Sequence, residues 1–476
     1  MNEKAHYLLI IALLFFLGFI SACSNSMVDK IDRGSDYSYQ PGFPELRIAS
    51  SAFIDSSNNS KISVSGDIVY GSLIYSNKDG VFEAPFSIEI AINNTDDSQT
   101  PVIREIFSDT LRGKSENIIH DQDVYQFRRE FSINPGTYDI QVAITDNSSQ
   151  KQVIREATTI VPSANSNVAN ITNVSLLAKN SSIDEGSFNQ ATTYHIPSKS
   201  DSLRFQFQVT NNAPDSEFEF QMRLLKFRND TSIARPMNFL NYSPSSMPYI
   251  GIDYDEFEVI QSSVRTFNQS GNVIIEYNFH ELPRGNYRLE VQSEDNSESD
   301  IYKAIEFSIK SPNFPAVKTP RELARPLYYL MDENEFNKMM SIEDPDELKA
   351  AIDRFWLTNI ENSRVAKDVL SLYYERVEEA NKQFSNFKEG WKTDPGMIYI
   401  LFGPPIYLDT FSDQMAWYYS YNRNDPEERF FFDLSKIRSK YYPFYNYILQ
   451  RDGSLYNVQR RQIQMWLSGL ILQDSL

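Results

Sequence analysis

Two long stretches of the chain place apolar residues at every second position. The runs 86–92 and 138–144 alternate in this way in the first stretch, and the runs 203–209 and 305–309 do so in the second. Alternation puts one set of side chains on each face of a strand. Clusters of Asn, Asp, Ser and Gly separate the strands at short intervals, which is typical of antiparallel sandwiches. The pattern predicts one β-sandwich at residues 46–164 and a second at residues 165–312.

The two stretches are related by an internal repeat. Residues 133–138 and 282–287 each contain a glycine turn that leads into a tyrosine, and the offset between Tyr138 and Tyr287 is 149. We expect both tyrosines to be structural, because each would be the first inward residue of its strand. The two units resemble immunoglobulin-like domains of bacterial surface lipoproteins. The resemblance implies a sandwich without the usual disulfide and implies no particular function.

The second copy of the repeat is expected to carry an insertion. The strand ending in Asn93-Asn94 matches the one ending in Asn211-Asn212 at an offset of 118, so about 31 residues should be extra before Tyr287. We expect them in the apolar, proline-bearing segment 229–263. A loop of this kind either binds a partner or folds back over the edge of its own sheet.

After residue 313 the apolar residues follow helical spacing. Thr319 and Asp344 each precede a proline and an acidic residue in the arrangement of a capped helix start. Apolar residues then mark one face of a helix as far as Trp356, and a longer helix follows to about Phe384. The predicted fold is therefore multidomain, with two antiparallel Ig-like β-sandwiches followed by an α+β domain at residues 313–476.

The segment after the long helix combines a turn with another apolar run. Gly390 is expected to end the helix in a left-handed conformation. Residues 398–402 alternate again and predict a strand, which the turn Gly403-Pro404-Pro405 ends. Between Gly390 and Tyr447, 17 of 58 residues are aromatic. They form either a small core or a stacking surface for sugar rings or a partner chain.

The string Gly390-Trp391-Lys392-Thr393-Asp394 resembles the motif of the bacterial GWxTD domain. A preceding Phe355-Trp356 pair and a later aromatic strand also match that family. The residues singled out by the resemblance are Gly390, Trp391, Thr393, Asp394, Gly403, Pro404, Pro405 and Trp417. They either hold the fold together or line a ligand groove. If all four tryptophans are buried, the interpretation of these residues as a ligand groove is excluded.

Two departures from the family pattern limit what the resemblance implies. Pro395 stands where the family usually has arginine, and the polar run usual after the Phe-Trp pair is weakened to residues 357–359. If the family pairs that arginine with a carboxylate, this chain cannot do so at that position. The resemblance implies an architecture and a cell-envelope setting, and it implies no reaction.

The N-terminus has the pattern of a lipoprotein signal peptide. Lys4 precedes an apolar run from Tyr7 to Ile20, which is too short to span a membrane. The string Ile20-Ser21-Ala22-Cys23 resembles the bacterial lipobox, which implies cleavage before Cys23 and its acylation. Residues 1–22 would then be the signal peptide and residues 23–45 a flexible tether. Ser24, in place of Asp, favours the outer membrane by analogy and leaves the membrane face open.

Composition excludes several classes of function. The chain carries 64 acidic and 45 basic residues, and its net charge of −19 disfavours nucleic-acid binding. A single Cys forbids an intrachain disulfide and a Cys-rich zinc site. None of the four His lies beyond His280, so a His-dependent catalytic site in the C-terminal domain is excluded. We predict no catalytic residues, metal or cofactor, although a carboxylate pair of Asp394 with Asp409 or Asp433 remains formally open.

These observations favour a non-enzymatic, lipid-anchored envelope protein that acts through protein–protein interaction. In this interpretation two sandwiches form a stalk, and the C-terminal domain is presented at its end. Its partners would be membrane lipid, through Cys23, and an envelope protein. The alternatives are a glycan-binding surface lipoprotein that uses aromatic stacking, and a His-free hydrolase.

Overall fold

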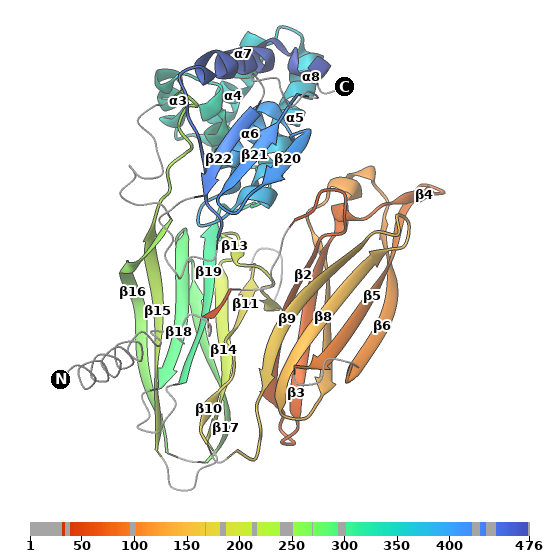
Figure 1. Ribbon diagram of the computed structural model, residues 1–476, viewed down its shortest axis with the longest axis vertical. Coiled ribbons are helices and arrows are strands. Elements are labelled where there is room, and N and C mark those ends of the chain that lie inside the picture. Colours follow the sequence, from red (N-terminus) through yellow and green to blue (C-terminus); the bar gives the residue numbers. More distant parts are fainter. Residues whose placement is uncertain are drawn as a thin grey trace, which may run out of the picture.

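The computed structural model describes residues 31–33, 39–95, 101–166, 168–180, 187–211, 217–238, 251–268, 270–293, 301–420, 429–434 and 444–474. The predicted signal peptide and Cys23 lie outside these residues. No helix among the described residues is long and apolar enough to cross a membrane. The described residues are mostly β-sheet, and their α-helices lie in the C-terminal third of the chain (Figure 1).

The first unit is built from two antiparallel sheets that share one apolar core. The smaller sheet has the order β2-β3-β7, and the larger has the order β4-β5-β8-β9 with β6 also paired to β5. The strands are β2 (Leu46–Ile54), β3 (Ser60–Val69), β4 (Ser76–Lys78), β5 (Val81–Asn94), β6 (Ile103–Gly113), β7 (Val124–Ser132), β8 (Gly136–Asp146) and β9 (Gln152–Val161). Alternate residues of facing strands, such as Val64 and Ile88, are fully buried between the sheets.

The second unit repeats this arrangement. One sheet has the order β10-β14-β11-β12 with β17 paired to β14, and the other runs β19-β18-β15-β16. The strands are β10 (Asn170–Ile171), β11 (Ser175–Lys179), β12 (Asn189–Gln190), β13 (His195–Pro197), β14 (Ser202–Asn211), β15 (Phe218–Asn229), β16 (Ile252–Phe267), β17 (Gly271–His280), β18 (Gly285–Ser293) and β19 (Ile301–Lys310). Strand β13 adds to β19 in parallel.

The predicted tyrosines occupy equivalent places in the two units. The Tyr138 hydroxyl donates to the carbonyl of Asn134 at 3.0 Å, and the Tyr287 hydroxyl donates to that of Pro283 at 2.5 Å. Each bond ties the start of a strand, β8 or β18, to the turn before it. Such tyrosine corners are typical of Greek-key sandwiches.

The Asn-Asn match, from which about 31 extra residues were expected, relates two strands that are not equivalent. Asn93 and Asn94 end β5, whereas Asn211 ends β14, which belongs to the other sheet of its unit. The strands are not equivalent, because β5 corresponds to β15. A pair of asparagines marks the end of many strands and does not identify one. The longer connection is nevertheless in the expected segment. It runs from residue 230 to 251 between β15 and β16, against 95 to 102 between β5 and β6.

The described part of this connection neither projects outward nor covers its own sheet. Residues 230–238 pack against the C-terminal domain, where Ala234 and Met237 are buried in its core. The backbone N–H of Ala234 donates to the carbonyl of Lys392 at 2.9 Å. For these residues the expectation that the insertion folds back over its own sheet is therefore wrong, and partner binding by the insertion stays a prediction. Residues 239–250 lie outside the described part.

The C-terminal domain places helices against a four-stranded antiparallel sheet with the order β20-β21-β22-β23. The helices are α2 (Pro320–Ala324), α3 (Glu333–Met340), α4 (Pro345–Asn359), α5 (Ser363–Phe384), α6 (Asp394–Phe402), α7 (Leu455–Ser468) and α8 (Ile471–Asp474). The strands are β20 (Tyr407–Thr410), β21 (Gln414–Tyr418), β22 (Arg429–Leu434) and β23 (Tyr447–Leu449). Thr319 and Asp344 cap α2 and α4 with their side chains, as their sequence contexts predict.

The strand predicted at residues 398–402 is wrong, because this segment is helix α6. Residues 397–401 are all buried, so the helix is apolar on every side and shows no 3.6-residue pattern. The residues at the two ends of the segment do indicate a helix. Thr393 caps the helix, Pro395 lies in its first turn, and Gly403 ends it with φ of +84°.

The predicted tether is packed in its described parts. Ile31 and Asp32 form strand β1 (Ile31–Asp32), which pairs in parallel with β19. The Arg33 side chain lies 3.0 Å from the carboxylate of Glu306, and the Tyr39 hydroxyl donates to Glu379 of α5 at 3.0 Å. Residues 31–33 and 39–45 therefore do not form a free tether, because their side chains find partners on the second sandwich and the C-terminal domain.

The three units are not strung in a line. The C-terminal domain caps one end of the second sandwich, and the first sandwich lies beside the second (Figure 1). The Gln208 side chain forms two hydrogen bonds, of 2.7 and 3.0 Å, with the backbone of Ile54. Thr192 donates to the carboxylate of Asp67 at 2.7 Å. These contacts join the two sandwiches side by side, which replaces the expected stalk.

Candidate functional site

The GWxTD motif lies between α5 and α6, in a 3₁₀ turn at Gly390–Lys392. Gly390 does not adopt a left-handed conformation, so the expected reason for it is wrong. A side chain at this position would bring its Cβ within 1.9 Å of the carbonyl oxygen of Ala380. The Gly390 N–H donates to the Ser385 hydroxyl at 2.8 Å. The glycine is needed because the turn lies directly on the backbone of α5.

Trp391 is held by hydrogen bonds from three directions. Its backbone N–H donates to the Asn381 side chain at 3.1 Å, and its carbonyl accepts from the Tyr329 hydroxyl at 2.6 Å. The indole N–H donates to the Glu389 carboxylate at 3.0 Å. The side chain is only 3% exposed. Trp391 therefore joins α5, the turn and the carboxylate before the motif into one buried cluster.

Thr393 and Asp394 begin helix α6. The Thr393 hydroxyl donates to the carbonyl of Gly390 at 2.7 Å and accepts from the N–H of Gly396 at 3.1 Å. The Asp394 carboxylate accepts two hydrogen bonds from the Arg451 guanidinium, at 2.7 and 2.8 Å, and one from the N–H of Leu449 at 2.8 Å. Both oxygens of Asp394 are occupied by these donors, so it is not placed as half of a carboxylate pair.

Arg451 extends this cluster to the second sandwich. Its guanidinium also donates to the carbonyls of Arg235 and Pro236, at 2.9 and 3.1 Å. These residues belong to the connection between β15 and β16. The side chains of Asp394 and Arg451 are 4% and 0% exposed, so the pair is shielded from solvent. The ion pair thus fixes three segments that are far apart in sequence.

The remaining motif residues also have structural roles. Gly403 ends α6, and its carbonyl accepts from the Tyr419 hydroxyl at 2.7 Å. Pro404 and Pro405 follow at the surface, before β20. Trp417 is 1% exposed in β21, and Trp356 and Trp466 are equally inaccessible. With all four indoles buried, the expected stacking surface formed by Trp391 and Trp417 is wrong.

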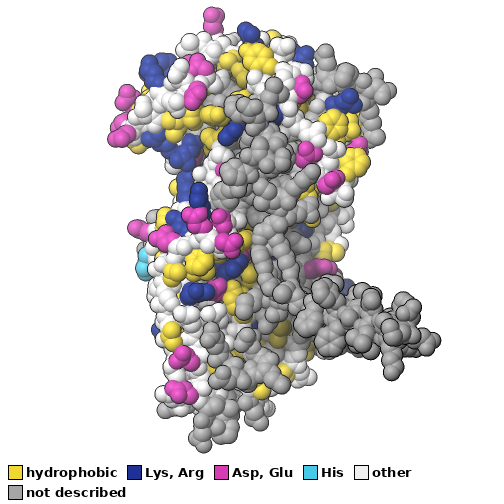
Figure 2. All heavy atoms as spheres, turned by 60° about the vertical axis from the view of Figure 1, so that its left-hand side comes forward, with side chains coloured by type: hydrophobic (Ala, Val, Ile, Leu, Met, Phe, Trp, Pro, Cys, Tyr) yellow, Lys and Arg dark blue, Asp and Glu magenta, His cyan; other side chains and the backbone are white. Residues whose placement is uncertain are grey.

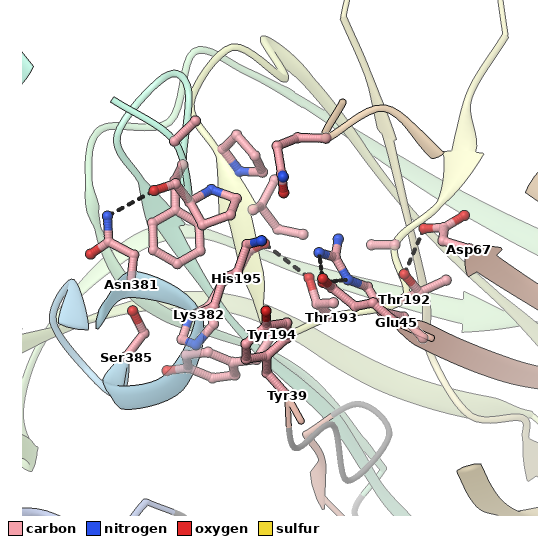
Figure 3. A pocket seen from close by; sticks show the side chains of 18 of the residues that line it. Tyr39, Glu45, Asp67, Thr192, Thr193, Tyr194, His195, Asn381, Lys382 and Ser385 are labelled. Atoms are coloured by element: carbon pink, nitrogen blue, oxygen red, sulfur yellow. Dashed lines mark hydrogen bonds and ion pairs between the residues drawn. The ribbon is translucent and has the colours of Figure 1, made fainter. Parts of the chain in front are cut away.

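A cavity of about 880 Å³ lies where the three units meet (Figure 3). The first sandwich contributes Asp67, the second contributes residues 192–197, and helix α5 contributes Asn381 and Lys382. Thr393 and Pro395 of the motif segment border the same space. The motif is therefore next to a cavity, although its tryptophan does not line it.

His195 is a titratable group of this cavity whose pKa is strongly affected by its location. Burial lowers the pKa of its imidazole well below the usual value, and Lys310 and Arg47 lower that pKa further. Its Nδ1 lies 3.1 Å from the Ser308 hydroxyl oxygen. Burial raises the pKa of Asp67, against the effect of its hydrogen bonds and of Arg47. A neutral imidazole beside a hydroxyl suits hydrogen bonding to a neutral group.

Within the described ranges, no three His, Cys, Asp or Glu side chains converge in a way that could hold a metal ion. The arrangement around the motif is best explained as a set of structural contacts among three units. The cavity adds space for a small molecule.

Comparison with known families identifies the C-terminal part of the chain. Residues 286–468 match the GWxTD domain, so this part of the chain is a GWxTD domain. The match begins in β18, inside the second sandwich, whereas the sequence pattern placed the domain start at 313. The side chain of Asn286 donates to the carbonyl of Phe387 at 3.0 Å, which links the first matched residue to the motif region.

Solved structures give weaker similarities. Red sea bream transglutaminase aligns with a TM-score of 0.18 and 9% identity, over 56% of this chain and 31% of that chain. Salmonella alpha-2-macroglobulin gives 0.18 and 11%, over 59% and 17%. The fibronectin(III)-like modules of Clostridium thermocellum CbhA give 0.15 and 10%, over 53% and 87%. The chain spans less than a third of the first two, and at these TM-scores the similarities carry no argument. No curated protein sequence matches the chain.

The residues that hold the motif in place were not found from the sequence. Asn381 is an exception to the apolar face of α5, and Ser385 follows the last residue of that helix. A polar residue at the inner face of a helix is a sequence signal for such a contact. Glu389 directly precedes the motif. Arg451 gives no local signal, because it is 57 residues beyond Asp394.

Proposed function

We propose that this protein is a lipid-anchored component of the bacterial cell envelope, in the outer membrane, and that it acts by binding another protein. The lipobox at Cys23, two immunoglobulin-like sandwiches and the GWxTD domain support this setting. The motif itself supports no reaction, because its polar groups are engaged in hydrogen bonds within the chain.

The observation that carries the proposal is a short apolar segment on the surface of the GWxTD domain. The side chains of Ile406, Leu408 and Phe411 are 40%, 51% and 55% exposed, and Tyr407 between them is 39% exposed. They follow the Gly-Pro-Pro turn and include strand β20. Clustered apolar side chains on the surface of an otherwise acidic protein mark a contact site for another protein.

The lipid anchor would set where this contact site can lie. Ile31 is eight positions beyond Cys23, and an extended chain of eight Cα–Cα steps spans at most about 28 Å. Because Ile31 is paired with β19, the second sandwich would lie close to the bilayer. The GWxTD domain and the first sandwich would then both be held near the membrane.

Affinity purification of the acylated protein from its native membrane, after crosslinking in intact cells, tests the protein contact. We expect a discrete protein partner with the wild type and its loss in the double variant Leu408→Asp, Phe411→Asp. The matched control is Ile106→Asp, because Ile106 is 59% exposed on the first sandwich. Equal recovery from all three chains would reject the surface at 406–411. The absence of any partner from the wild type would reject the proposed function.

Metabolic labelling with a palmitate analogue tests the anchor separately. The wild type should be labelled and Cys23→Ala should not. A soluble, unlabelled wild type would remove the lipid anchor and leave the protein contact to be judged by the crosslinking result.

A further inference from the structure

A second cavity, of about 580 Å³, lies between the second sandwich and the GWxTD domain. Its walls come from the end of β19, the turn before β18, the connection after β15, and the motif segment. Trp391 and Phe387 supply aromatic surface, and Phe336 and Met340 of α3 complete it. All of these residues are described by the structure.

The charged residues of this cavity are mostly basic. The cavity is lined by five basic side chains and one acidic side chain. The basic ones are Arg284, Lys310, Arg325, Lys388 and Lys392, and the acidic one is Glu389. Figure 2 shows basic side chains gathered where the GWxTD domain meets the second sandwich, with acidic side chains on the sandwich just below them. The excess of positive charge contrasts with the net charge of −19 for the whole chain.

Two of the cations have carboxylate partners. Lys388 lies 3.1 Å from the carboxylate of Asp230, and Lys392 lies 3.2 Å from that of Glu389. The ammonium group of Lys310 donates to the carbonyl of Asn386 at 2.8 Å. The other oxygen of Glu389 accepts from the N–H of Ser311 at 3.1 Å.

The two arginines lack a carboxylate at such a short distance. Arg284 approaches Glu389 only to 3.8 Å, and its side chain is 40% exposed. The Arg325 side chain makes no hydrogen bond or ion pair with any residue in the described parts of the chain, and Glu389 and Glu322 act on its charge only from a distance. A guanidinium has five N–H donors in a planar fork, so both side chains have donors available to a ligand.

The pKa shifts of these groups fit an electropositive space. Burial and the positive charge of Lys392 lower the pKa of Lys310 and Glu389 raises it, and together they leave it at about 7. Burial, Arg284 and Arg321 lower the pKa of Arg325, against the opposite effect of Glu389 and Glu322. Burial would raise the pKa of Glu389, but Lys392, the bond from Ser311 and the other cations bring it to about 2. A bound anion would oppose the crowding of positive charge.

We propose that this cavity binds a phosphate-bearing anion, with Arg284 and Arg325 as its principal ligands and Lys310 and Lys392 beside them. A phosphate monoester carries up to two negative charges and accepts paired hydrogen bonds from a guanidinium fork. The one carboxylate in the cavity is already matched by Lys392. The volume lies within the usual range for small-molecule pockets, so an organic group can accompany the phosphate. The site is separate from the contact surface at residues 406–411.

Isothermal titration calorimetry of the full chain in detergent, with glycerol 3-phosphate as the probe, tests the proposal. We expect saturable binding by the wild type and a loss of affinity of about tenfold or more in each of Arg325→Met and Arg284→Met. Arg325 makes no bond within the described chain, so its removal should not disturb the fold. Arg354→Met is the control, because it removes the same charge from an exposed position on α4.

Equal affinity for glycerol 3-phosphate in all four chains would overturn the proposal, and so would failure to bind either glycerol 3-phosphate or phosphatidic acid. Circular dichroism melts of each variant in the absence of probe separate a binding defect from unfolding. Neither outcome depends on the crosslinking result, so failure of this proposal and failure of the proposed function are distinguishable.

Vesicles distinguish a free phosphate ester from a lipid headgroup. We would use the chain with Cys23→Ala, which has no acylation site, and vesicles of phosphatidylcholine with or without phosphatidic acid. Binding to phosphatidic acid that Arg325→Met abolishes would make the ligand a headgroup. Binding of the soluble probe alone would make it a free phosphate ester. Vesicle binding that is unchanged by Arg325→Met, without binding of the soluble probe, would overturn the proposal.

Discussion

The two sandwiches differ in the connection that follows a pair of equivalent strands, β5 in the first and β15 in the second. In the first, residues 95–102 join β5 to β6, and the N–H of Val102 bonds back to Ile92 of the same hairpin at 2.8 Å. Its side chain is 54% exposed. In the second, the connection after β15 leaves its sheet, and Met237 is fully buried in the core of the GWxTD domain.

This difference indicates that the second sandwich and the GWxTD domain form one structural unit. They share buried side chains, including a small cluster of Leu225, Phe227 and Ile252 with Phe387. The family match begins at residue 286, within the second sandwich, which agrees with that division. The first sandwich is joined to the second by hydrogen bonds such as those of Gln208. We therefore expect two cooperative units, the first sandwich and the remainder.

Breaking the buried ion pair should have the largest effect on this division. Asp394→Asn leaves the Arg451 guanidinium buried without a counter-charge, so we expect the remainder to lose about 3–5 kcal/mol of unfolding free energy. Differential scanning calorimetry should show a lower melting temperature for its transition and an unchanged one for the first sandwich. The control is Arg104→Met, which removes an exposed ion pair with Glu89 and should cost about 1 kcal/mol or less.

A shift of both transitions by Asp394→Asn would contradict the division into two units. The double variant Asp394→Leu, Arg451→Met leaves no unpaired charge and should recover part of the loss.

The two connections themselves provide the next comparison. Met237→Ala removes a fully buried side chain, so we expect a loss of about 2–5 kcal/mol from the unit that contains the GWxTD domain. Val102→Ala, at the equivalent connection of the first sandwich, should change stability by about 0.5 kcal/mol or less. Urea unfolding followed by tryptophan fluorescence measures the first change, because all four tryptophans lie beyond residue 355. Similar effects of the two substitutions would show that the connections do not differ in this way.

Much of the fold could be predicted from the sequence, because most elements have a local signal. Strands buried on one face alternate, and the helix starts at Thr319 and Asp344 carry capping residues. Helix α6 could not be recognised by period, since a helix buried on all sides has none. The docking of Ala234 and Met237 was also missed, because buried residues in an irregular connection follow no period.

The candidate site was predicted less well than the fold. The motif pointed to the right segment, but the interpretation of Trp391 and Trp417 as a stacking surface failed because both are buried. Arg451 and Asn381 meet the motif only through tertiary folding. The cationic cavity gathers Arg284, Lys310 and Arg325 from separate elements, and no spacing along the chain indicates that convergence.

Burial of Lys310 should make the difference in stability between the two units depend on pH. Its folded pKa of about 7 lies below the usual value of 10.5, so the folded state loses this proton first as pH rises. The penalty for burying the charge is fully present below pH 7, falls between pH 7 and 10.5, and is absent above that range. Lys392, whose pKa burial also lowers, acts in the same direction.

The unit containing the GWxTD domain should therefore gain stability from pH 7 to pH 9, relative to the first sandwich. Each unit of pKa difference corresponds to about 1.4 kcal/mol. Lys310→Met should flatten this rise, and calorimetric scans at several pH values would measure it. If Lys310→Met and the wild type show the same slope, the side chain keeps its proton in the folded state and the assignment is wrong.

The two tyrosine corners should give the smallest and most evenly matched effects. Tyr287→Phe and Tyr138→Phe each remove one hydrogen bond to a backbone carbonyl, at a cost of about 1 kcal/mol. Because the two corners are equivalent, each substitution should lower the melting temperature only of the cooperative unit that contains it. The transition that shifts therefore shows to which unit each sandwich belongs. We expect Tyr138→Phe to lower only the melting temperature of the first sandwich. Tyr287→Phe should lower the shared transition of the second sandwich and the GWxTD domain. A separate transition for the second sandwich in Tyr287→Phe would show that the shared core is too small to couple them.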